Sequence, residues 1–159
     1  MSNVQALLDR QDIHDVLMRY ARGIDRRDFD LVASCYHPGA TDDHGRSKGP
    51  VEEFIPWVTE TLQRFETTMH FLGNVLIELD GDAAAVETYC VAYHRLVGQD
   101  VDSVAGLRYV DRFERRDDGW RIADRQIVVE WNRIDDVTSL GFGPEYVRGR
   151  HDHTDPAYG

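Results

Sequence analysis

Asp25 and His70 are the two residues of this chain whose types best suit acid–base chemistry. They lie forty-five positions apart, so only the folded structure can bring them together. A carboxylate that hydrogen-bonds an imidazole fixes one tautomer of the ring and holds it as a base. If the fold places this pair inside an apolar cavity, the imidazole could remove a proton from a bound molecule.

Both residues also have ordinary structural interpretations. His70 directly precedes Phe71 in an apolar segment, where a histidine often hydrogen-bonds a backbone carbonyl. Asp25 lies near the end of a predicted helix and could pair with Arg26 or Arg27. The residue types alone therefore leave a structural and a catalytic role open for each.

Tyr20 and Arg125 are the next candidates. Tyr20 lies in the middle of an apolar helical stripe, so core packing is its ordinary role, although a buried hydroxyl needs a partner. Arg125 is flanked at i±2 by apolar residues, on a face where an unpaired guanidinium is costly. A surface ion pair with Asp111 or Glu114 is the ordinary alternative for this arginine.

Two clusters have the composition of a metal site. Residues 42–44 (Asp-Asp-His) are consecutive, so few of their side chains could converge on one ion. Residues 151–155 contain two histidines and an aspartate in a polar segment that has no apolar scaffold. We expect neither cluster to bind a metal, and we expect no cofactor.

The segment that contains Tyr20 and Asp25 is predicted to be an amphipathic helix. Between Ile13 and Ile24, apolar residues recur with the spacing i, i+3, i+4, i+7, i+8 and i+11. At about 100° per residue, Asp25 lies at the border of this stripe. The carboxylate is thus expected beside the core, close to the end of the helix.

Two further helices and a loop follow. Asp28 can cap a short helix over residues 29–35. Residues 39–49 are polar and contain glycine, which predicts a loop. A third helix is predicted from about residue 50 to 62, although Pro56 should kink it or delay its start.

From His70 onward the pattern becomes that of strands separated by turn sequences at residues 80–82 and 116–119. Three helices followed by four long antiparallel strands predict an α+β domain. A strongly twisted sheet could curl around the helices into a cone, with a pocket between its inner face and the first helix. The predicted strands cover residues 71–79, 83–96, 104–115 and 120–131.

Composition narrows the function classes. The 159 residues are most consistent with one domain, here residues 1–137, followed by an irregular tail over 138–159. A net charge of −11 argues against nucleic-acid and anionic-membrane partners. Charged residues at positions 9–12 interrupt the stretch where a signal peptide would be apolar. With two cysteines and no apolar run of membrane-spanning length, we expect a cytoplasmic protein.

Four segments together resemble the SnoaL-like branch of the nuclear transport factor 2-like superfamily, over about residues 3–135. This branch includes hexachlorocyclohexane dehydrochlorinase, bile-acid 7α-dehydratase and, more distantly, scytalone dehydratase. The resemblance implies a cone-shaped α+β barrel, also described as cystatin-like, with a deep apolar pocket. The segments are 20–25 (YARGID), 69–74 (MHFLGN), 109–116 (YVDRFERR) and 119–122 (GWRI).

The resemblance also implies roles for residues. Asp25 and His70 match the catalytic dyad of the dehydrochlorinase and the bile-acid enzyme, so His70 would take a proton from carbon. Tyr20 matches a tyrosine of the bile-acid enzyme and would donate to the leaving group. Arg125 matches a pocket arginine of the dehydrochlorinase and would stabilise developing negative charge. The residues that we expect to contact substrate are Ile24, Asn74, Thr88, Cys90, Ala92, Leu107 and Val129.

These interpretations predict a cofactor-free lyase, of the dehydratase or dehydrohalogenase type, that acts on a hydrophobic cyclic small molecule. An isomerase of a steroid-like or polyketide substrate with the same dyad is one alternative. A non-catalytic small-molecule-binding or accessory protein is the other. The strand faces that carry Glu87, Tyr89 and Tyr93 leave a semi-apolar outer surface, and relatives bury theirs, so we expect a homodimer or homotrimer.

Overall fold

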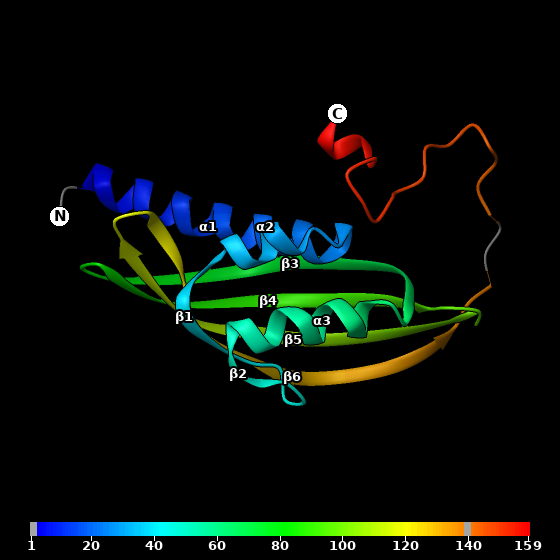
Figure 1. Ribbon diagram of the computed structural model, residues 1–159, viewed down its shortest axis with the longest axis horizontal. Helices are drawn as coiled ribbons and strands as arrows, with labels where there is room; N and C mark the ends of the chain where they lie inside the picture. The colour runs from blue at the N-terminus through cyan, green and yellow to red at the C-terminus, as the bar shows by residue number, and fades with distance from the viewer. Residues whose placement is uncertain (1–2, 139–140) are drawn as a thin grey trace.

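Helix α1 (Asn3–Arg26) lies along one face of a curled sheet (Figure 1). The computed structural model describes residues 3–138 and 141–159. The buried side of α1 follows the predicted stripe, and Ile13, Leu17 and Tyr20 are almost fully buried. Because the helix continues to Arg26, Asp25 lies in its last turn with its side chain turned toward the core.

The end of α1 is fixed by contacts that also determine the position of Asp25. Arg27 adopts a left-handed backbone (φ 54°), and the Asp28 amide donates to the Gly23 carbonyl at 2.9 Å. This pattern terminates the helix in the manner of a Schellman motif. The Arg27 guanidinium then donates to the carbonyls of Leu62 (3.2 Å) and Phe65 (2.6 Å). These bonds tie the end of α1 to the segment that leads into the strand carrying His70.

Two shorter helices complete the helical layer. Asp28 caps α2 (Phe29–Ser34) as predicted, with its Oδ1 accepting from the Leu31 amide at 3.0 Å. Helix α3 (Val51–Leu62) contains Pro56 in its interior and begins at the predicted place. Its buried side chains, including Phe54 and Val58, join those of α1 in one core.

The six strands form one sheet in the order β2-β1-β6-β5-β4-β3. Neighbouring strands are antiparallel except β1 and β6, which are parallel. The sheet curls around the helices without closing (Figure 1), which confirms the predicted α+β class and fits the cone. The strands are β1 (Tyr36–Asp43), β2 (Lys48–Pro50), β3 (Phe65–Asp80), β4 (Ala83–Leu96), β5 (Val101–Arg116) and β6 (Gly119–Asp136).

The prediction of a loop over residues 39–49 is wrong for most of its length. Residues 36–43 form β1 and residues 48–50 form β2, at the edge of the sheet. Polar residues are tolerated here because they find side-chain partners, as Asp42 does with Tyr36 at 2.6 Å. The two added strands extend the predicted four-stranded sheet to six.

The end of the chain folds back onto the helical layer. The Tyr158 hydroxyl donates to Asp28 at 3.0 Å, and Arg26 pairs with Asp155 at 3.4 Å. A short 3-10 turn (Pro156–Tyr158) completes this segment. Across residues 3–138 and 141–159, we find no helix that is both long and apolar enough to span a membrane.

Candidate active site

Asp25 and His70 meet at the wall of the core. The His70 ring Nδ1 lies 2.7 Å from Asp25 Oδ1, and the His70 amide donates to Asp25 Oδ2 at 2.8 Å. The Thr68 hydroxyl donates to Oδ1 at 3.0 Å. Three donors from one strand therefore hold the carboxylate, and the carboxylate in turn fixes the imidazole.

The electrostatics keep the Asp25 carboxylate charged. Burial raises its pKa, but the hydrogen bonds from His70 and Thr68 outweigh burial and the pKa is lowered overall. An ionised Asp25 accepts a hydrogen bond from Nδ1–H of His70. The other ring nitrogen, Nε2, then carries no proton and has a free lone pair. Within the described residues, no hydrogen bond occupies Nε2. This nitrogen is therefore available as a proton acceptor.

His70 borders an apolar cavity of about 150 Å³ between the helices and the inner face of the sheet. An apolar cavity of roughly this volume admits one benzene-sized ring. Aromatic and aliphatic side chains from α1, α3 and four strands make up most of the wall. The lining residues are Tyr20, Ile24, His44, Trp57, Val58, Thr61, Leu62, Phe65, His70, Ala92, His94, Ala105, Leu107, Tyr109 and Ile127.

The structure separates the seven residues expected to contact substrate into two groups. Ile24, Ala92 and Leu107 line the cavity, as predicted. The other four do not, and for these the prediction of a cavity contact is wrong. Thr88 and Cys90 share the inner face of β4 with Ala92 and are buried but do not line this cavity, whereas Asn74 and Val129 are exposed.

Tyr20 lines the cavity, whereas Arg125 lies behind the wall. Burial raises the pKa of the Tyr20 hydroxyl, so it remains protonated and can donate a hydrogen bond. The Arg125 side chain is 0% exposed and forms two hydrogen bonds to Asp111, at 2.8 and 2.7 Å. Its guanidinium carbon lies 4.1 Å from the ring centre of Tyr20 and 4.2 Å from that of Tyr109. The predicted partner is confirmed, but the ion pair is buried rather than on the surface.

The predicted direct contact between Arg125 and a bound molecule needs correction. Two tyrosine rings cover Arg125, so it can act on a molecule in the cavity only indirectly. Its Nη1 has no hydrogen-bond partner among the described residues, and the ring faces of Tyr20 and Tyr109 supply cation–π contacts instead. Arg125 thus contacts Tyr20, which itself lines the cavity.

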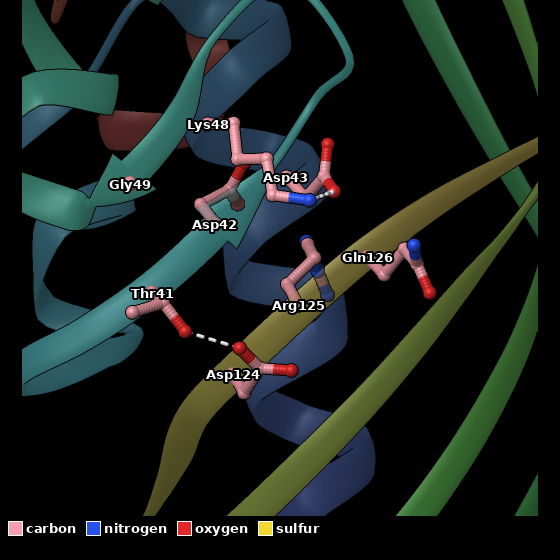
Figure 2. A pocket seen from close by; sticks show the side chains of 8 residues that line it. All are labelled: Thr41, Asp42, Asp43, Lys48, Gly49, Asp124, Arg125 and Gln126. Carbon is pink, nitrogen blue, oxygen red and sulfur yellow. Dashed lines mark hydrogen bonds and ion pairs between the residues drawn. The ribbon is translucent and has the colours of Figure 1, made fainter.

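Arg125 and Asp42 also border a second, polar hollow of about 340 Å³ outside the sheet edge, shown in Figure 2. Its wall is closed by short contacts of its own: Thr41 bonds Asp124, and Lys48 pairs with Asp43 at 2.8 Å (Figure 2). These pairs occupy Asp43, Lys48 and Asp124 with partners from the hollow itself. We therefore place the candidate active site in the apolar cavity.

Two further histidines line the apolar cavity, and sequence reasoning missed both. His94 lies on β4 with its ring centre 5.2 Å from that of His70, and burial together with His70 lowers its pKa to about 4. His44 hydrogen-bonds Asp42 through Nδ1. The signal was available for His94, because it continues the i, i+2 alternation of Cys90 and Ala92 along the inner face of β4.

The curled sheet and the helical layer, with the Asp–His pair at the wall of an apolar cavity, form the cone-like α+β fold of nuclear transport factor 2-like proteins. More specifically, the chain belongs to the SnoaL-like domain family, whose model matches residues 5–126. The resemblance stated from the sequence is thereby confirmed.

Relatives with a similar sequence include uncharacterized protein Rv2910c of Mycobacterium tuberculosis (strain ATCC 25618 / H37Rv). It is 33% identical over 130 residues, which cover 79% of this chain and 88% of that protein. The family is therefore shared with a relative that has no described activity.

Solved structures with the same fold include hexachlorocyclohexane dehydrochlorinase LinA-type3 from Novosphingobium barchaimii LL02. It aligns with a TM-score of 0.77 and 20% identity, over 90% of this chain and 99% of that chain. A candidate scytalone dehydratase from Novosphingobium aromaticivorans DSM 12444 aligns with a TM-score of 0.77 and 15% identity, over 92% and 99%. At these identities the likeness shows a common fold.

Proposed function

We propose that this protein is a cofactor-free lyase that removes water or hydrogen halide from a small hydrophobic ring compound. The observation that carries the proposal is the 2.7 Å hydrogen bond between Asp25 and His70 at the wall of an apolar cavity. This arrangement places an oriented imidazole beside a space for a ligand. The fold shared with a dehydrochlorinase and a candidate dehydratase supports the same class of chemistry.

In the proposed reaction, His70 Nε2 takes a proton from a carbon atom of the substrate. The electrons of the broken C–H bond form the new double bond, and the leaving group departs with its own bonding pair. A halide departs as the anion, whereas a hydroxyl group departs as water after the His70 imidazolium passes it the proton taken from carbon. Asp25 stabilises the imidazolium, and the Tyr20 hydroxyl donates a hydrogen bond to the departing group.

The size of the cavity restricts the substrate. A volume of about 150 Å³ holds one ring with small substituents. A steroid-like substrate with four fused rings would have to extend far outside it. The isomerase alternative is therefore limited to single-ring substrates. The same Asp25–His70 dyad would transfer a proton within such a compound.

A screen of single-ring alcohols, ketones and halides for loss of water or halide tests the proposal. We expect turnover of at least one compound by the wild-type protein, and its loss in His70→Gln. His14→Gln is a matched control because His14 lies on the exposed side of α1. Ring compounds that bind in the cavity but are never converted would favour the non-catalytic binding or accessory protein.

We also propose that the outer face of the sheet forms an interface with a second copy of the chain. Met69, Phe71, Tyr89, Tyr93 and Trp131 lie on this face with 38–64% of their surface exposed. The strand register places Met69 opposite Tyr93 on adjacent strands, so these two side chains are neighbours on this face. A soluble monomer rarely leaves a patch of this kind uncovered.

Light scattering at micromolar concentration should give a mass of two or three times 18.3 kDa, the mass of one chain. Phe71→Glu should lower that mass, because it places a charge in the apolar interface. Val147→Glu is the control, since Val147 is an exposed apolar residue of the C-terminal segment rather than of a strand. A wild-type mass of one chain would exclude the proposed interface.

A further inference from the structure

The apolar cavity is lined by a second histidine that bonds an aspartate, and the proposed reaction gives this pair no role. His44 follows β1 and His70 lies on β3, and three strands separate β1 from β3 in the sheet. Both imidazoles nevertheless line the same cavity, because the sheet curls around it. A ligand in the cavity therefore meets one oriented imidazole from each side of the sheet.

The contacts of Asp42 determine which nitrogen of His44 is left for a ligand. The Tyr36 hydroxyl donates to Asp42 Oδ2 at 2.6 Å, and His44 Nδ1 bonds to Oδ1. Both oxygens of Asp42 accept hydrogen bonds, so the neutral His44 ring must carry its proton on Nδ1. Nε2 then carries a lone pair and can only accept a hydrogen bond while the ring is neutral.

Packing holds the His44 ring in this orientation. The ring stacks on Phe54, with centres 4.5 Å apart and planes 27° from parallel, and Trp57 lies 6.0 Å away. Burial lowers the pKa of His44 although Asp42 opposes the shift, which favours the neutral ring. The result is a fixed acceptor in a wall that is otherwise mostly apolar.

A fixed acceptor selects among ligands. A ring without a donor would displace water from Nε2 and leave that nitrogen unpaired, which costs binding free energy. A site built to bond a hydroxyl group rejects analogues that lack it far more strongly than an apolar pocket rejects a change of size. The acceptor therefore favours ligands that carry a hydroxyl group.

We infer that the substrate is a hydroxylated single ring whose hydroxyl group donates to Nε2 of His44 while the opposite edge of the ring faces His70. This inference rests on the proposed function for the identity of the reacting site, and it adds the substrate class. It disfavours a halogenated hydrocarbon without a donor, because such a ring would leave the His44 acceptor unpaired.

Phenol and toluene provide a matched pair of probes, because they have nearly the same size and differ in the donor. We expect the wild-type protein to bind phenol about tenfold or more tightly than toluene in calorimetric or NMR titrations. A purely apolar cavity would give the opposite order, since phenol is the more costly of the two to remove from water. His44→Phe keeps an aromatic ring against Phe54 and should abolish or reverse the preference.

The contact can also be tested on the wild-type protein, so that the result does not depend on whether His44→Phe folds. Long-range ¹H–¹⁵N spectra of the imidazoles should show a shift of His44 Nε2 on addition of phenol and a smaller one with toluene. His14→Gln, on the exposed side of α1, should leave the preference unchanged. Equal affinities, tighter binding of toluene, or an unperturbed His44 Nε2 would each overturn the inference.

One further variant separates this inference from the proposed function. His70→Gln should lose turnover, but it should keep the preference for phenol because His44 is intact. If the phenol preference holds while no ring compound is converted by the wild-type protein, the lyase proposal fails and the His44 contact stands. If a ring without a donor is converted efficiently and His44→Phe changes nothing, the inference fails and the lyase proposal stands.

Discussion

Replacing His70 with glutamine should lower kcat/KM by about 10²–10⁴-fold, because it removes the general base while leaving the cavity wall in place. Asp25→Asn should cost a comparable factor. Asp25 accepts three hydrogen bonds from β3, and one of its oxygens fixes the imidazole tautomer. An amide offers a donor where one of these acceptors lies, so the ring can adopt the wrong tautomer. Steady-state kinetics on the compound that the screen identifies would measure both losses.

The two substitutions should not be additive. His70 and Asp25 act as one unit, so the double variant should be about as slow as the slower single variant. Thr68→Val removes only the 3.0 Å bond to Asp25 Oδ1 and should have a much smaller effect. Circular dichroism would verify that each variant is folded. Full activity in a folded His70→Gln protein would contradict the assignment of the base.

The helical half of the fold was predictable because its signals are local. The stripe from Ile13 to Ile24 and the cap at Asp28 each depend on residues within a few turns of one another. Strand β1 was not predictable in the same way. Its sequence contains Pro38, Gly39 and Asp42, which is typical of a loop, and its parallel partner β6 lies some eighty residues later. Such a strand forms because tertiary pairing outweighs local preference.

The site was predictable to the extent that family resemblance located it. The resemblance selected Asp25 and His70, and the structure brings them together. His44 was considered only as part of a metal-like cluster, although the spacing of Asp42 and His44 places two residues on one side of an extended chain. How deep each residue lies could not be read from alternation. Cys90 and Ala92 share a face of β4, yet only Ala92 reaches the cavity.

The position of Arg125 shows the same limit. The flanking apolar residues indicated an apolar face, but a guanidinium on such a face could either enter the cavity or pair beneath it. The structure pairs it with Asp111, and neither side chain has exposed surface. Because Arg125 contacts the rings of Tyr20 and Tyr109, we expect loss of the pair to disturb both the cavity wall and the stability of the fold.

Asp111→Asn should therefore lower the free energy of unfolding by about 3–5 kcal/mol, because it leaves the Arg125 charge buried without a counter-charge. Urea unfolding, at one protein concentration for all variants, would measure the change. Asp135→Asn provides the matched control: it breaks the exposed pair with Arg133, at 2.8 Å, and should cost less than about 1 kcal/mol. Replacing both members of the buried pair, with Arg125→Met and Asp111→Leu, should recover much of the loss, because no unpaired charge remains in the core. A loss for Asp111→Asn no larger than that of the control would show that the core tolerates an unpaired Arg125.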